Sequence, residues 1–255
     1  MNNSRRLTGL NVDQKEDWQK RVDLAAVFRL AAYHNWHEAV ANHFSLAVSA
    51  DGKQFLMNPR WKHFSHIRAS DLLLLQVDDH SVLERPDAPD ITAWCIHARL
   101  HALAPQARCV LHLHPPYATA LTALSDPEIR PIEQNTARFF RRIAYDNDFG
   151  GMANTEEEGD RLVRVLGNKS VMMMGNHGVL VASSTVAEAY DCIYYLERAC
   201  QTQVLAYSTG KTLKIMSDTV AERTAQDWED YADSAFMHFE EMKKILHSID
   251  PSYAD

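Results

Sequence analysis

Two histidines separated by one residue stand at the end of an apolar segment, with a spacing that could bind a metal ion. Successive side chains of a β-strand point to opposite faces, so His112 and His114 would project from the same face. Pro115 and Pro116 follow directly and end the strand, which places the pair at the end of a strand. The alternative is a pair of histidines that alternate with leucine on a half-buried strand, because His-x-His alone is a weak signal.

A third histidine, His177, lies in the turn Asn176-His177-Gly178 between two apolar segments. Glycine permits backbone conformations that strain other residues, and such a turn would present His177 at the end of a sheet. A histidine in a turn is most often just solvated. Together with His112 and His114, however, it would supply three nitrogen ligands and leave positions open, which is typical of a catalytic metal site.

The elements that must position these histidines follow from the periodicity of the apolar residues. We predict helices over 14–35, 91–104, 156–166, 186–207 and 219–249, and strands over 45–50, 54–58, 72–77, 109–114, 170–175 and 178–182. The Asp51-Gly52 pair predicts a hairpin between the first two strands. Hairpins with helices before and after them indicate one sheet covered by helices. The chain has no Gly-x-Gly-x-x-Gly motif, so a dinucleotide-binding fold is not expected.

The composition is that of an ordinary globular protein, with 46% hydrophobic and 24% charged residues and a net charge of −8. No basic stripe indicates a nucleic-acid partner, and no apolar stretch approaches the roughly 20 residues that span a bilayer. The polar N-terminus lacks the apolar segment of a secretory signal. No Cys-x-x-Cys spacing occurs, so we expect a cytoplasmic protein with reduced core cysteines, namely Cys95, Cys109, Cys192 and Cys200.

Further short motifs occur in a fixed order along the chain. They are Asn42-His43-Phe44-Ser45, Asn58-Pro59, Ser70-Asp71-Leu72, His97-Ala-Arg-Leu-His101, Val110-Leu-His-Leu-His-Pro-Pro-Tyr-Ala-Thr-Ala120 and Gly175-Asn-His-Gly-Val-Leu-Val181. In this order they resemble the class II aldolase/adducin family, which includes fuculose-phosphate aldolase, ribulose-phosphate epimerase and the adducin head domain. The resemblance covers residues 20–210.

The resemblance implies a single α/β domain over residues 1–255, an αβα layered domain with a central, mostly antiparallel sheet. Its core would cover residues 20–210 and a helical tail residues 219–249. It also implies one divalent metal per subunit on the three histidines, zinc foremost and iron or manganese as alternatives. The family commonly forms homotetramers that act on small molecules. Asn42 falls among the substrate-binding residues, and Tyr145 matches a tyrosine that donates a proton in a neighbouring subunit's site.

The chain departs from the aldolases at Ala93, where they carry the glutamate that binds the metal and transfers the proton. Alanine cannot move a proton, so another carboxylate must serve if that chemistry is retained. Glu133 is a candidate base, with a solvated loop carboxylate as the alternative. Asp90 is a second candidate, with a helix cap as the alternative. His97 and His101 are one helical turn apart and would either orient a ligand or be satisfied core histidines.

Three functions remain open. The first is a metal-dependent lyase that stabilises an enolate from a hydroxy-carbonyl or keto-acid, by aldol cleavage, decarboxylation or epimerisation. Arg60-Trp61 replaces a phosphate-binding Thr-Gly pair, so we expect a non-phosphorylated substrate whose carboxylate pairs with Arg60 or Arg138. The second is a non-haem iron oxygenase on the same fold, because three neutral ligands also suit Fe(II). The third is a non-catalytic interaction module like the adducin head, against which the three retained histidines count.

Overall fold

In the computed structural model, residues 12–231 and 233–255 are described, and positions 1–11 and 232 lie outside the described residues. The polar N-terminal segment interpreted above therefore receives no structural test. The described residues form one sheet of seven strands in the order β3-β2-β1-β4-β7-β6-β5. The strands are β1 (His43–Ala47), β2 (Gln54–Met57), β3 (Leu73–Gln76), β4 (Cys109–Leu113), β5 (Ile143–Asp146), β6 (Val171–Met174) and β7 (Gly178–Ser183). Among the strand pairs of the described residues, only β5–β6 is parallel, which confirms the mostly antiparallel sheet.

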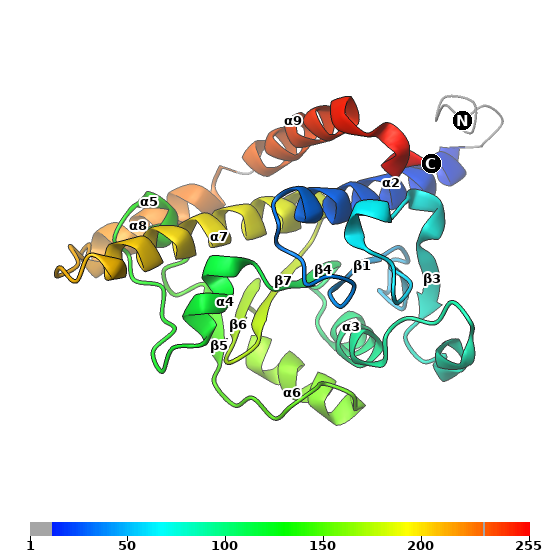
Figure 1. The fold of residues 1–255 in the computed structure, drawn as a ribbon, viewed down its shortest axis with the longest axis horizontal. Coiled ribbons are helices and arrows are strands. Elements are labelled where there is room, and N and C mark those ends of the chain that lie inside the picture. The colour runs from blue at the N-terminus through cyan, green and yellow to red at the C-terminus, as the bar shows by residue number, and fades with distance from the viewer. Residues whose placement is uncertain (1–11, 232) are drawn as a thin grey trace.

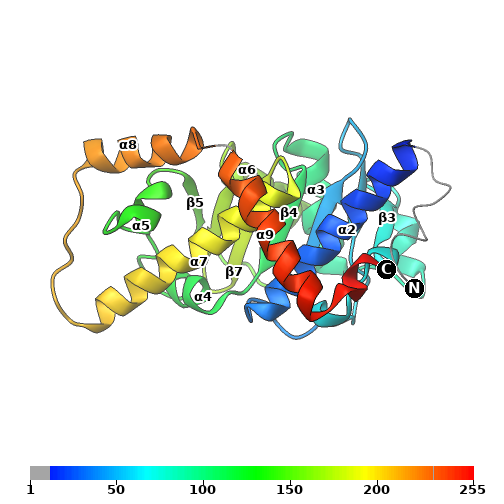
Figure 2. The same cartoon turned by 90° about the horizontal axis from the view of Figure 1, so that it is seen from above.

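Helices cover both faces of the sheet. The α-helices are α2 (Val12–Tyr33), α3 (Ile91–Leu103), α4 (Pro116–Thr122), α5 (Gln134–Arg138), α6 (Glu156–Leu166), α7 (Val186–Ser208), α8 (Asp218–Glu229) and α9 (Asp233–Ile249). Short 3-10 segments are η1 (Phe64–His66), η2 (Ala69–Asp71), η3 (His80–Glu84) and η4 (Pro251–Ala254). Helices α2 and α7 lie on one face and α3 and α6 on the other (Figure 1), while α9 crosses over α2 and α7 (Figure 2). The predicted αβα layering is confirmed.

Strand β4 shows how the two layers determine which way each side chain points. Cys109, Leu111 and Leu113 belong to the apolar core shared with α2 and α7, whereas Val110 belongs to the core shared with α3 and α6. The strand is apolar on both faces because helices cover both. By the same alternation, His112 points toward the α3 side of the sheet.

Among the α-helices and strands, three elements and one helix break were not predicted. Helix α4 begins at Pro116, a residue interpreted only as a strand stop, although proline is well tolerated in the first helical turn. The segments α5 and β5 are short and lack a clear apolar period. The prediction of a single helix over 219–249 is wrong, because α8 packs on α5 whereas α9 packs on α7 and α2.

The cysteine prediction is confirmed, since all four cysteines are free and buried. Among the described residues, no helix has both the length and the apolar character needed to cross a membrane.

Candidate metal centre

Three histidines meet beside the ends of β4 and β7. His112 is in β4, His114 follows that strand, and His177 is in the turn between β6 and β7. One ligand atom from each lies within 4.8 Å of the others. The ring centroids are 4.7 to 5.2 Å apart. The three histidines identified in the sequence thus lie together, close enough to share one ion.

The strand pairing fixes the orientation of His112. Its Nδ1–H donates to the carbonyl oxygen of Val179 on β7 at 3.0 Å, which leaves the lone pair on Nε2. In metal-binding histidines, a hydrogen bond from the ring nitrogen that does not bind the metal sets the tautomer and the ring orientation. Burial lowers the pKa of His112 well below its usual range and that of His177 to about 4. Both rings are therefore neutral near pH 7, as a metal ligand must be.

His114 provides the test of whether these residues fit a metal ion. Its Nε2 is buried and has no hydrogen-bond partner among the described residues. A buried polar atom without a partner is costly, and coordination of an ion would satisfy it. The ring occupies space that Gly178 leaves free, because a Cβ there would lie 2.3 Å from Cδ2 of His114. The donor set and its surroundings therefore fit a divalent metal.

The turn before β7 works differently from the sequence interpretation. The residue with positive φ is Asn176, at 55°, and asparagine tolerates this left-handed conformation. Gly178 is needed for space instead, since its added Cβ would also lie 2.8 Å from the carbonyl oxygen of Leu113. Glycine is thus needed at position 178 for space and not for its backbone conformation, which corrects the prediction.

Glu38 is a functional candidate that the sequence did not reveal. Its carboxylate oxygen lies 3.7 Å from Nδ1 of His114. Its backbone N–H donates to Oδ1 of Asn42 at 2.6 Å, and Asn42 is buried. The predicted substrate-binding residue Asn42 thus holds the loop that carries Glu38. No spacing rule links positions 38 and 114, because the loop and β4 meet only in the folded chain.

No carboxylate replaces the aldolase glutamate at position 93. Ala93 is 2% exposed and packs in an apolar cluster with Phe55 and Trp94. Asp90 caps α3 by accepting hydrogen bonds from the backbone N–H and hydroxyl of Thr92, at 2.8 and 2.6 Å. The alternative reading of Asp90 as a helix cap is confirmed.

Glu133 and Tyr145 make structural hydrogen bonds. The carboxylate of Glu133 accepts from the backbone N–H groups of Asn135 and Thr136 at 2.8 and 2.7 Å, which caps α5. The hydroxyl of Tyr145 accepts from the backbone N–H of Ile129 at 3.0 Å, and burial raises the pKa of this tyrosine. Both side chains stabilise their own subunit, so neither enters the function proposed below as a catalytic residue.

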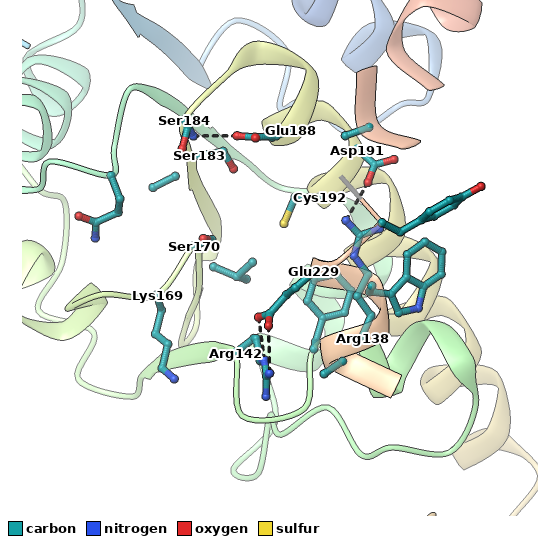
Figure 3. Close-up of a pocket in the computed structure, with 18 of the residues that line it drawn as sticks. Arg138, Arg142, Lys169, Ser170, Ser183, Ser184, Glu188, Asp191, Cys192 and Glu229 are labelled. Carbon is teal, nitrogen blue, oxygen red and sulfur yellow. Dashed lines mark hydrogen bonds and ion pairs between the residues drawn. The ribbon is translucent and has the colours of Figure 1, made fainter. Parts of the chain in front are cut away.

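The two predicted carboxylate-binding arginines differ in their surroundings. Arg60 is exposed and remains available to a ligand. Arg138 lies in a cavity of about 570 Å³ whose lining includes none of the three histidines. Its Nη2 pairs with the buried Asp191 at 2.7 Å (Figure 3). Its guanidinium carbon lies 4.8 Å from the ring centroids of both Tyr195 and Trp228. Arg138 therefore anchors α5 to α7 and α8 rather than facing the histidines.

Comparisons with other proteins show which family the chain belongs to. Residues 22–204 match the family model described as the class II aldolase and adducin N-terminal domain. The chain belongs to this family. A relative in Caulobacter vibrioides, named as an aldolase class 2 protein, is 34% identical over 206 residues, which cover 81% of this chain and 79% of the relative. Beta-adducin of Homo sapiens is 31% identical over 194 residues, which cover 74% of this chain and 26% of that protein.

Solved structures of the family agree with the fold. The aldolase II superfamily protein from Pseudomonas syringae superposes with a TM-score of 0.86 at 30% identity, over 99% of this chain and 100% of that chain. The L-fuculose 1-phosphate aldolase from Glaciozyma antarctica superposes with a TM-score of 0.79 at 20% identity, over 96% and 95%. The second comparison supports the fold alone.

Proposed function

We propose that this protein is a divalent-metal-dependent lyase that acts on a non-phosphorylated hydroxy-carbonyl or keto-acid substrate. The observation that carries the proposal is the convergence of three imidazoles on one point, with Nε2 of His114 buried and unpaired. Three protein ligands leave positions for substrate oxygens, as in catalytic metal sites. The resemblance to the aldolases supports the reaction class, and Arg60 at the phosphate-binding position supports the absence of a phosphate.

A bound divalent ion would polarise a substrate carbonyl and stabilise the enolate that forms when a C–C or C–H bond breaks. The chain's own residues prepare the site for this chemistry. Val179 holds His112 in the tautomer that leaves Nε2 free, and the Glu38 carboxylate faces Nδ1 of His114. We propose that Glu38 orients the ring of His114, since carboxylates commonly set the tautomer of a metal-binding histidine.

We further propose zinc as the ion, a homotetramer as the assembly and the cytoplasm as the location. Zinc and the tetramer rest on the resemblance to the aldolases. The cytoplasmic location rests on the four free, buried cysteines, which suit a reducing compartment.

The reaction class can be tested without knowing the natural substrate. Zinc-loaded protein is incubated in D₂O with hydroxyacetone, pyruvate or dihydroxyacetone phosphate, and loss of the proton next to the carbonyl is followed by NMR. We expect exchange with one or both unphosphorylated compounds and none in the metal-stripped protein. Exchange with the phosphorylated compound alone would contradict the substrate class, and absence of exchange from all three would contradict the enzyme.

A non-catalytic module is the second candidate, favoured by the 31% identity to beta-adducin together with the alanine at position 93. A module of this kind would bind zinc without proton exchange on any of the three compounds, or would bind no metal at all. The exchange experiment therefore separates the two candidates directly.

A further inference from the structure

A row of buried polar side chains leads from the metal centre into the layer between the sheet and α3. In β1, Phe44 and Leu46 face the core on the α2 side, so His43 and Ser45 face α3. His43 lies opposite the metal-centre residue His112 in the β1–β4 register. None of the side chains in the row is more than 5% exposed, and they are His43, Ser45, His97 and His101.

Four hydrogen bonds connect this row, which we call the histidine relay (His43, His97, Ser45, His101 and the carbonyl of Ala107). Nδ1 of His43 lies 2.8 Å from Nε2 of His97, and Nδ1 of His97 lies 2.5 Å from Oγ of Ser45. Oγ of Ser45 lies 2.6 Å from Nε2 of His101, whose Nδ1 lies 2.8 Å from the carbonyl oxygen of Ala107.

The carbonyl end determines the direction of every bond in the relay. A carbonyl oxygen only accepts, so Nδ1 of His101 carries a hydrogen and donates to Ala107. If His101 is neutral, its Nε2 is bare and accepts from the hydroxyl of Ser45. Oγ of Ser45 must then accept from Nδ1–H of His97, and because burial keeps His97 neutral its Nε2 is bare. That nitrogen accepts from Nδ1–H of His43, so Nε2 of His43 is bare as well.

Burial supports the neutral forms of His101 and His97. No carboxylate of the described residues is hydrogen-bonded to the relay, and an unpaired buried charge is costly. Asp90 is close enough to raise the pKa of His43, but the effect of burial is larger and lowers it. Burial accordingly lowers the pKa of His101 to about 4. A single tautomer therefore extends along the whole relay.

The bare Nε2 of His43 has no hydrogen-bond donor among the described residues of the chain. The His43 ring centroid lies 4.9 Å from that of His112, so the free lone pair is beside the metal centre. We propose that the relay fixes His43 as a hydrogen-bond acceptor there, and that His43 binds the hydroxyl hydrogen of a 2-hydroxy acid or hydroxy-carbonyl ligand. The ligand class rests on the proposed function, whereas the orientation of His43 does not.

The orientation is tested on metal-free protein, so it is independent of whether the protein is an enzyme. Histidine labelled with ¹⁵N and ¹³C is incorporated, and long-range ¹H–¹⁵N spectra at pH 7 report which ring nitrogen carries the hydrogen. The signals are assigned with single His→Gln variants. We expect His43, His97 and His101 all to carry the hydrogen on Nδ1. A hydrogen on Nε2 of His43 would overturn the proposal.

Ser45→Ala tests whether the relay causes this orientation. Removal of the hydroxyl breaks the chain between His97 and His101, so we expect His97 and His43 to show a mixture of tautomers. Ser65→Ala is the matched control, because Oγ of Ser65 lies 2.7 Å from Nδ1 of His63, outside the relay. Unchanged tautomers in a folded Ser45→Ala protein would contradict the relay, and the wild-type spectrum decides the orientation if this variant does not fold.

The ligand class is tested by calorimetry on zinc-loaded protein with lactate and 2-methoxypropanoate. Lactate has a hydroxyl hydrogen to donate, whereas 2-methoxypropanoate has a methyl group in its place. We expect the preference for lactate to fall about tenfold in His43→Phe, the loss of one hydrogen bond. It should be unchanged in His66→Phe, at an exposed position. An equal preference in wild type and His43→Phe would overturn the ligand class. Failure to bind zinc would instead contradict the proposed function and leave the tautomer result standing.

Discussion

Two regions of the molecule are rich in titratable side chains, and they differ in how these side chains are matched. In the cavity next to α5, opposite charges pair: Arg138 with Asp191, and Arg142 with Glu222 and Glu229. At the metal centre, three imidazoles that repel one another when charged are packed together instead. Opposite charges compensate one another, whereas three neutral imidazoles with an unpaired buried Nε2 fit a metal ion. The second pattern therefore marks the site.

The largest effect on folding should come from the cavity. Among the described residues, Arg138→Ala would leave the buried carboxylate of Asp191 with His238 as its remaining side-chain partner, so we expect a loss of about 3–5 kcal/mol in unfolding free energy. Urea denaturation measures this loss, with Arg141→Ala as the exposed control at no more than about 1 kcal/mol. Metal content should not change. Unchanged stability with weakened ligand binding would restore the substrate-binding role of Arg138.

Gly178→Ala should act on the metal centre. The added Cβ would displace the ring of His114, so zinc affinity should fall about tenfold to hundredfold. Competition with a chromogenic chelator measures the affinity. Gly150→Ala is the matched control, since a Cβ at Gly150 meets no atom within 4 Å. Equal zinc affinity in both variants would mean that the position of His114 does not matter for metal binding.

Tyr145→Phe distinguishes a structural from a catalytic tyrosine. It leaves the backbone N–H of Ile129 without its acceptor, so the unfolding free energy should fall by about 1–2 kcal/mol. The proton-exchange rate of the zinc-loaded protein should stay within twofold of wild type. A large loss of exchange with unchanged stability would show instead that Tyr145 is the proton donor predicted from the sequence.

The smallest effect is expected at Glu133. Removing the helix cap in Glu133→Ala should cost about 1 kcal/mol of stability, whereas Glu133→Asp keeps a good capping residue and should cost less. Thermal unfolding of the two variants measures the difference. If proton exchange is abolished in both variants while their stability is unchanged, Glu133 is a base after all.

The sequence predicted the layers and the three histidines because those signals are local. The alternation around His112 and the apolar periods of the long helices are visible within a few residues. The Glu38 contact and the direction of the histidine relay could not be predicted, since they depend on how the loop, β1 and α3 pack in three dimensions. The surroundings of Arg138 could not be predicted for the same reason, because its partner Asp191 lies 53 positions away. Pairing of charges is a property of the fold, not of the sequence pattern.

The most direct test of the central claim is elemental analysis of purified protein beside a His112→Ala/His114→Ala variant. A His66→Ala/His80→Ala variant, at two exposed positions, controls for the loss of two histidines. We predict about one divalent metal per chain, zinc foremost, in wild type and control and none in the first variant. Iron in its place would support the oxygenase. Equal metal content in all three proteins, or no metal in any of them after zinc is added, would contradict the metal centre.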